Sequence, residues 1–116
     1  MKTTAAHFEY FKSEVLRWVE KLGVTDYRVG FLHTNIDAYA RVRTLSVKKV
    51  ATVDFCTDWY TEERPLNKAS ITDTAKHEAI HILLSDLASI GNSRFVTTDE
   101  ALTAEEATVR RIQRLL

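Results

Sequence analysis

Cysteine, proline and glycine are all scarce in this chain of 116 residues. Its single cysteine, Cys56, has no partner for an intramolecular disulfide, which favours a reducing compartment such as the cytoplasm. One proline and three glycines argue against long flexible linkers and low-complexity tracts. Length and composition therefore predict a single domain over residues 1–116, located in the cytoplasm.

Net charge and long apolar runs are absent as well. Lysine plus arginine equals aspartate plus glutamate, with 16 of each class, so the composition predicts no binding to nucleic acid or to an anionic membrane. No apolar run approaches the roughly 20 residues that a membrane-spanning helix needs. The first residues include Glu9 and lack the long apolar stretch of a secretory signal.

The spacing of apolar residues predicts an α+β fold. Apolar residues recur at helical spacing from Thr4 to Leu22, and Gly23 follows as a stop signal. From Asp26 to Cys56 the period changes to two, which predicts three strands. The turns between these strands, His33–Asp37 and Ser46–Lys49, are short, so the simplest arrangement is an antiparallel meander.

Two further helices are expected after the strands. The first covers Thr72–Ile90, where Ser70 and Asp73 have the spacing of a capping box and Gly91 supplies a stop. The second covers Thr97–Leu116, and its apolar stripe consists of Val109, Ile112 and Leu116.

The first of these helices contains the motif H-E-x-x-H at residues 77–81. Residues four apart lie on one face of a helix, so His77 and His81 can bind one cation together. Zinc binds neutral imidazole readily and keeps one position for water in catalytic sites. Glu78 would be the general base that takes a proton from the zinc-bound water and gives it to the leaving amine. Asp86 is a candidate to orient a ligand histidine, with a surface position as the alternative.

A catalytic zinc site requires a third protein ligand, and Glu105 and Glu106 of the closing helix are the candidates. Glu105 lies near the centre of the apolar stripe, whereas Glu106 lies towards its edge. Each has a local explanation too. Thr103 and Glu106 have capping-box spacing, and Glu105 suits the first turn of a helix. These residues alone leave the choice open.

An H-E-x-x-H helix, a short loop and a second helix with glutamate together resemble the gluzincin branch of zinc metallopeptidases. The small size resembles phage-encoded minimal metallopeptidases and the catalytic domain of ImmA/IrrE-type regulatory proteases. In those families small or apolar residues follow the ligand glutamate at plus three, plus six and plus ten. Counted from Glu106, these positions hold Val109, Ile112 and Leu116. The resemblance therefore favours Glu106 over Glu105 and implies Zn²⁺ bound by His77, His81 and Glu106.

The resemblance also implies a minimal zincin-like fold, with an N-terminal helix, a three-stranded antiparallel sheet, the motif helix and a C-terminal helix. In such folds an edge strand, expected here at Ala51–Cys56, pairs with an extended peptide substrate. The irregular stretch before the motif helix contains Trp59 and Tyr60, which are the expected substrate contacts, with a hydrophobic lid over the sheet edge as the alternative. A protein of this kind resembles phage proteins that act in the cytoplasm of a bacterial host.

The chain departs from the family pattern at two places. Leu87 stands where a metzincin would have a third histidine, and no histidine or tyrosine follows Glu106 to donate to the transition state. Tyr60, Arg94 and Arg110 are candidates for that donor. The predicted function is a zinc-dependent metallopeptidase that hydrolyses peptide bonds in a protein or peptide substrate. The alternatives are a zinc-binding zincin-like module with a regulatory or structural role, and a metal-free helical interaction domain.

Overall fold

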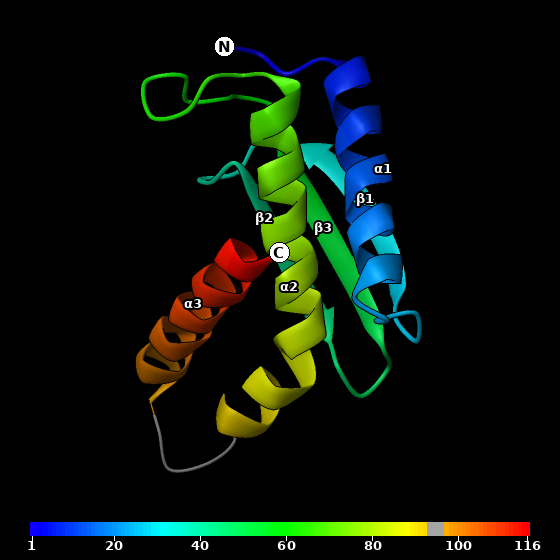
Figure 1. Ribbon diagram of the computed structural model, residues 1–116, viewed down its shortest axis with the longest axis vertical. Coiled ribbons are helices and arrows are strands. Elements are labelled where there is room, and N and C mark those ends of the chain that lie inside the picture. The colour runs from blue at the N-terminus through cyan, green and yellow to red at the C-terminus, as the bar shows by residue number, and fades with distance from the viewer. Residues whose placement is uncertain (93–96) are drawn as a thin grey trace.

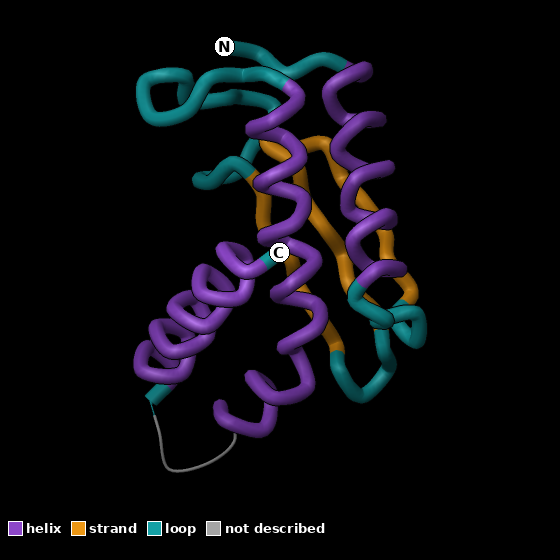
Figure 2. Tube along the Cα trace, viewed as in Figure 1, coloured by secondary structure: helices purple, strands orange, loops and turns teal. Residues whose placement is uncertain are grey.

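A computed structural model describes residues 1–92 and 97–116, and these residues form three helices and a three-stranded sheet. Figure 1 shows the elements along the chain, and Figure 2 shows helices and strands in separate colours. The predicted α+β class is confirmed. The elements are α1 (Ala5–Lys21), β1 (Arg28–Thr34), β2 (Ala40–Leu45), β3 (Val50–Cys56), α2 (Lys68–Asn92) and α3 (Thr98–Leu115).

Helix α1 has a defined signal at each end. The hydroxyl of Thr4 accepts a hydrogen bond from the backbone N–H of His7, and the His7 ring accepts one from the backbone N–H of Thr4. This reciprocal pair is a capping box, which satisfies two N–H groups that the helix itself leaves free. Just after the helix, Gly23 has φ of 75°, a left-handed conformation that glycine adopts at little cost.

Helix α2 extends beyond both predicted ends. Asn67 accepts a hydrogen bond from the backbone N–H of Ser70, so Asn67 has the capping role predicted for Ser70. At the other end the helix reaches Asn92 and therefore includes Gly91, the predicted stop. Helix α3 begins where it was expected, because the side chain of Thr97 caps its first turn.

The sheet is mixed, so the predicted antiparallel meander is wrong. The strand order is β1-β3-β2, with β3 parallel to β1 and antiparallel to β2. The predicted edge strand, Ala51–Cys56, is thus the central strand, and β2 is one of the two edges. The physical reason lies in the side chains. Most of β3 is buried on both faces, whereas β2 alternates between buried and exposed residues, as a strand at an edge does.

The register of β2 decides which of its backbone groups are free. The N–H of Cys56 donates to the carbonyl of Tyr39 at 2.9 Å, so Tyr39 directs its polar groups at β3. In an antiparallel pair, successive residues alternate between bonding the partner strand and facing away from it. Three residues of β2 therefore direct their N–H and C=O groups at the free edge, namely Ala40, Val42 and Thr44.

The two arginines of β2 lie on the outer face of the sheet. Guanidinium nitrogens of Arg41 and Arg43 lie 2.8 and 3.0 Å from the carboxylate oxygens of Asp54 on β3. Asp54 is fully buried although none of the described helices covers this face, because the two arginine side chains cover it. The contact compensates the buried carboxylate and ties β2 to the central strand.

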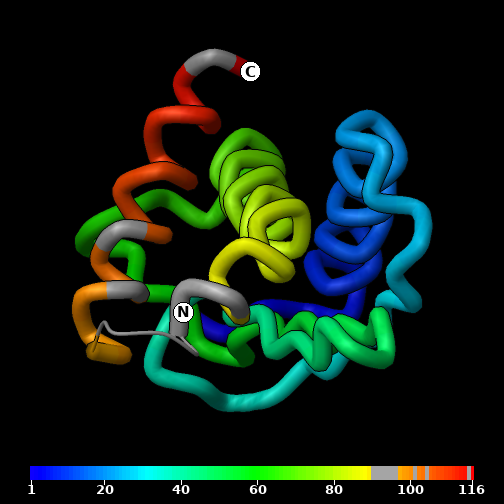
Figure 3. Tube along the Cα trace, turned by 90° about the horizontal axis from the view of Figure 1, so that it is seen from below, coloured from blue at the N-terminus to red at the C-terminus, as the bar shows by residue number. Residues whose placement is uncertain are grey.

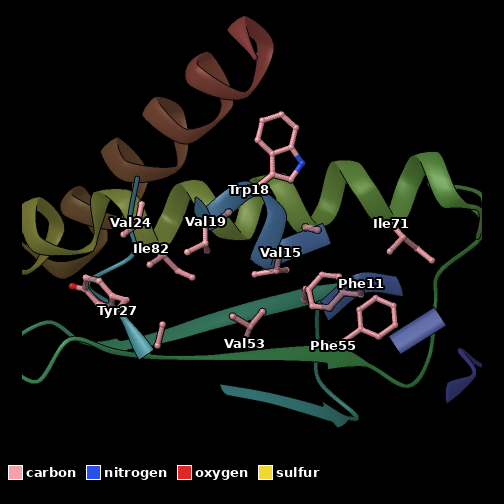
Figure 4. Close-up of a cluster of buried hydrophobic side chains, with 14 of the residues drawn as sticks. Phe11, Val15, Trp18, Val19, Val24, Tyr27, Val53, Phe55, Ile71 and Ile82 are labelled. Carbon is pink, nitrogen blue, oxygen red and sulfur yellow. The ribbon is translucent and has the colours of Figure 1, made fainter. Parts of the chain in front are cut away.

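The core lies between the sheet and the helices α1 and α2, which cover the same face of the sheet, as Figure 3 and Figure 4 show. Phe11 and Phe55 stack at its centre with ring centroids 4.5 Å apart. Helix α3 packs against α2 on the side away from α1, where Val109 is completely buried. Within the described residues, no helix has the length and apolar character needed to cross a membrane.

Candidate metal centre

Helix α2 holds His77, Glu78 and His81 in one group that could bind a metal ion. Each side chain offers one ligand atom, and these atoms lie within 4.8 Å of one another. The two imidazole centroids are 5.0 Å apart, as expected for residues on adjacent turns. The part of the helix between the two histidines is anchored in the interior, since Ala79 and Ile80 are completely buried. The polar group is thus carried by a rigid element.

Helix α3 brings a carboxylate to both imidazoles. Glu106 Oε1 lies 2.6 Å from His81 Nε2, and Glu106 Oε2 lies 3.4 Å from His77 Nε2. Glu106 is inside α3, which begins at Thr98, so a capping role with Thr103 does not explain it. Glu106 therefore faces the same nitrogen, Nε2, of each ring.

Glu105 approaches His81 from the other side. Its Oε2 contacts His81 Nδ1, and it lies in the interior of α3 rather than in the first turn. An ionised carboxylate can only accept a hydrogen bond, so Nδ1 of His81 donates to Glu105, which leaves Nε2 as the nitrogen available to a metal ion. Metal-binding histidines usually donate their second N–H to such a group. The two neighbouring glutamates thus occupy two different places around one ring.

His77 has a corresponding partner that the sequence analysis missed. Its Nδ1 lies 2.9 Å from Oε1 of Gln113, a residue two helical turns beyond Glu106 on the same face of α3. That spacing of seven residues was the available signal in the sequence. Asp86, the predicted candidate for this orienting role, instead accepts a hydrogen bond from the Tyr27 hydroxyl at 2.6 Å and pairs with Lys49.

Glu78 is the most unusual carboxyl group of the site. It is 6% exposed, and its Oε2 is buried without a hydrogen-bond partner among the described residues. The pKa of Glu78 is raised to about 7, mainly by burial. The nearby His81 acts to lower this pKa, whereas the carboxylates of Glu106 and Glu105 add to the rise. A carboxyl group with this pKa can exchange a proton near neutral pH, as a general base must.

The residues present fit a divalent cation. Two imidazole nitrogens and a carboxylate converge, and a buried carboxyl oxygen beside them has no hydrogen-bond partner in the described part of the chain. Ligand atoms on one tetrahedral zinc ion lie about 3.3 Å apart, given Zn–N and Zn–O bonds of about 2 Å. The separation of 3.4 Å between Glu106 and His77 matches this spacing. The 2.6 Å separation between Glu106 and His81 is shorter than this spacing, so the carboxylate must withdraw slightly to admit the cation.

Two adjoining clefts run beside the free edge of β2 and meet at Glu78. The larger, of about 550 Å³, includes His77, Gln113 and Tyr60 in its lining. The smaller, of about 320 Å³, includes His81 and both glutamates of α3. Both clefts share Ala38, Ala40 and Glu78. The His–Glu–His group is therefore open to a ligand that lies along the edge strand.

The two predicted substrate contacts have different surroundings. Tyr60 is 49% exposed and lines the larger cleft. Trp59 is 1% exposed, and its indole N–H donates to the carbonyl of Arg64 at 2.9 Å, so it is a core residue and its predicted contact with substrate is wrong. Of the other proposed donors, Arg110 has a side chain that is 64% exposed and lies 3.9 Å from Glu106, and Arg94 is outside the described residues.

No family model, curated protein or solved structure matches the chain. The geometry itself provides three observations. A His–Glu–His group on α2 can hold a metal ion, a glutamate from α3 contacts both imidazoles, and the group lies in a cleft beside an unpaired strand edge.

Proposed function

We propose that this protein is a zinc-dependent metallopeptidase in which His77, His81 and Glu106 hold the metal. The observation that carries the proposal is the contact of one carboxylate with Nε2 of both imidazoles, next to the buried and unpartnered oxygen of Glu78. Two histidines and one carboxylate are a ligand set of catalytic zinc sites, which keep a position for water. An additional carboxyl group in that position suits hydrolysis rather than a structural role.

Glu78 performs the proton transfers in this proposal. Zinc, when bound, polarises the scissile carbonyl and lowers the pKa of the attacking water. Glu78 takes the proton of that water through its free Oε2 and delivers it to the leaving amine. The raised pKa of Glu78 supports both steps, because the same group has to accept and then release a proton near neutral pH.

The free edge of β2 binds the substrate as an extended strand. The outward N–H and C=O groups of Ala40, Val42 and Thr44 lie along the two clefts that meet at Glu78. A peptide that pairs with this edge by backbone hydrogen bonds passes its amide bonds in front of the metal group. The strand that pairs with the substrate is thus β2, in place of the 51–56 segment expected from the sequence. Tyr60 contacts the substrate at the end of the larger cleft.

The decisive experiment compares wild type and Glu78→Gln with a library of unstructured random peptides, with cleavage followed by mass spectrometry. We expect the variant to keep one zinc ion and its fold and to lose at least about 100-fold in cleavage rate, the usual contribution of a general base. Glu9→Gln, an exposed carboxylate on α1, is the matched control and keeps full activity. A Glu78→Gln variant that cleaves as fast as wild type would exclude this role.

A zinc-binding module without peptidase activity is the second candidate. The observation that favours it is the lack of a histidine or tyrosine between Glu106 and Leu116 to stabilise the transition state. Stoichiometric zinc in a wild-type protein that cleaves no peptide of the library would establish this alternative. A protein that binds no zinc at all would exclude both functions and leave a metal-free interaction domain.

A further inference from the structure

Gln113 connects His77 to the beginning of α2. Its Oε1 lies 2.9 Å from His77 Nδ1, and its Nε2 lies 2.8 Å from Asp73 Oδ1 and 3.0 Å from the backbone carbonyl of Asp73. Asp73 is itself held, because a guanidinium nitrogen of Arg64 lies 3.5 Å from its carboxylate. The same guanidinium nitrogen of Arg64 donates a 3.0 Å hydrogen bond to the hydroxyl of Thr74.

The chemistry of these groups fixes the orientation of the amide. Both oxygens of Asp73 that contact Gln113 can only accept hydrogen bonds, so the amide must direct its NH₂ group at Asp73. Its oxygen then faces His77 and can only accept. Nδ1 of His77 therefore carries the ring proton, and the lone pair of Nε2 faces Glu106. Asp73 thus determines, through Gln113, which nitrogen of His77 is free to bind a metal.

The two ligand histidines are oriented by different groups. His81 donates to the carboxylate of Glu105, whereas His77 donates to a neutral amide. We propose that Gln113 is a positioning residue, which sets the tautomer and ring orientation of His77 for metal binding, and that Asp73 sets the orientation of Gln113. This inference rests on the proposed zinc site and adds residues that the motif does not contain.

The first test measures zinc affinity by competition with a chelator. Gln113→Met keeps the length of the side chain but offers His77 only a weak thioether acceptor, and we expect zinc to bind about 10- to 100-fold more weakly. Arg111→Met, at an exposed position on the same helix, is the matched control and keeps wild-type affinity. Thermal unfolding of both metal-free variants establishes that any loss of affinity is not a loss of fold.

The second test is a rescue that a purely structural role would not produce. Gln113→Glu still offers an acceptor to His77 but confronts Asp73 with a second carboxylate and no donor, so it weakens zinc binding at least tenfold. Adding Asp73→Asn supplies an NH₂ group that restores the side-chain hydrogen bond with reversed direction, while the bond to the backbone carbonyl of residue 73 stays lost. The double variant should return to within a few-fold of wild-type affinity.

The outcomes separate this inference from the function on which it rests. A wild-type protein without zinc would overturn both. If wild type binds zinc and Gln113→Met binds it equally well, the positioning role is excluded and the peptidase proposal is untouched. The same holds for a double variant that binds zinc no better than Gln113→Glu, because Asp73 then does not act through Gln113.

Discussion

Glu106 contacts His81 through Nε2 at 2.6 Å. Its neighbour in the sequence, Glu105, contacts the opposite nitrogen of the same ring. Two adjacent acids of one helix thus lie on two sides of one imidazole, and the side chain of Glu105 is the less exposed of the two, at 16% against 38%. This difference in position gives the two residues different expected effects on zinc binding.

Replacing each glutamate by glutamine separates a ligand from an orienting group. Glu105→Gln keeps an acceptor for His81 and should weaken zinc binding by about tenfold to 100-fold, as loss of an outer partner does. Glu106→Gln removes the carboxylate that completes the ligand set and should weaken it by more than about 100-fold. Chelator competition measures both effects. The reverse order would assign the third ligand to Glu105.

Proline substitutions test the free edge of β2. The N–H of Val42 faces the edge, so Val42→Pro removes a donor for substrate but no bond to β3. We expect kcat/KM for peptides to fall by about fivefold, which corresponds to the loss of one hydrogen bond of about 1 kcal/mol. Arg43→Pro removes a bond to β3 and should instead lower the urea midpoint much more than Val42→Pro does. Unchanged kcat/KM in folded Val42→Pro would exclude strand pairing at this edge.

Substitutions in the loop before α2 test the corrected roles of its aromatic residues. Trp59→Ala empties a completely buried site and should cost about 3–5 kcal/mol of unfolding free energy. Tyr60→Ala should change stability by less than about 0.5 kcal/mol, because the side chain is half exposed. Tyr60→Ala should raise KM for peptides while zinc affinity stays unchanged. A wild-type KM in this variant would remove Tyr60 from the substrate site.

The pH dependence of stability tests the surroundings of His33. Burial lowers the pKa of His33, with repulsion from His7 as the smaller cause. The Thr3 hydroxyl donates to the carbonyl of Cys56, so it accepts from Nε2–H of His33 at 2.7 Å. The ring also stacks on Phe8 with centroids 4.8 Å apart. These contacts hold the neutral imidazole in a partly buried place.

The sign of the effect follows from where protons bind. The unfolded chain takes up a proton at the ordinary value of 6.5, whereas folded His33 does so only at lower pH. Its contribution to stability is complete above that value and is lost as the pH falls towards the folded pKa. Between about pH 7.5 and about pH 5 the urea midpoint should therefore fall more for wild type than for His33→Gln. His7→Gln keeps a capping-box residue and removes only the smaller cause, so its slope should lie between those of wild type and His33→Gln and nearer to wild type. Equal slopes for wild type and His33→Gln would contradict the prediction.

The helices and the histidine pair could be predicted from the sequence because local signals define them. Thr97 caps α3, Gly23 follows α1, and the spacing of His77 and His81 places both on one face of α2. The order of the strands could not be predicted in the same way, since short connections fit a meander equally well. A cue existed in the charges. Arg41 and Arg43 alternate with less polar residues along β2, as expected for a strand with one face in solvent.

The partners of the histidines were less accessible to prediction. A glutamine such as Gln113 is an ordinary residue on a helix, and only the packing of α3 on α2 places it beside His77. The choice between Glu105 and Glu106 depends on the rotation of α3 about its own axis, which a helical wheel gives only approximately. Trp59 was misplaced because its position in an irregular segment suggested exposure, whereas its indole is enclosed and satisfied by the carbonyl of Arg64.

The contact of Asp54 with Arg41 and Arg43 also affects the register between β2 and β3. Deleting one residue from the 35–39 connection would change hydropathy very little, yet it would favour sliding β2 by one position against β3. Both arginines would then turn towards α2, and Asp54 would be left buried without a counter-charge. These ion pairs therefore disfavour a shifted register. The outer face of the sheet in this way maintains the register that places the buried side chains of β2 on the opposite face.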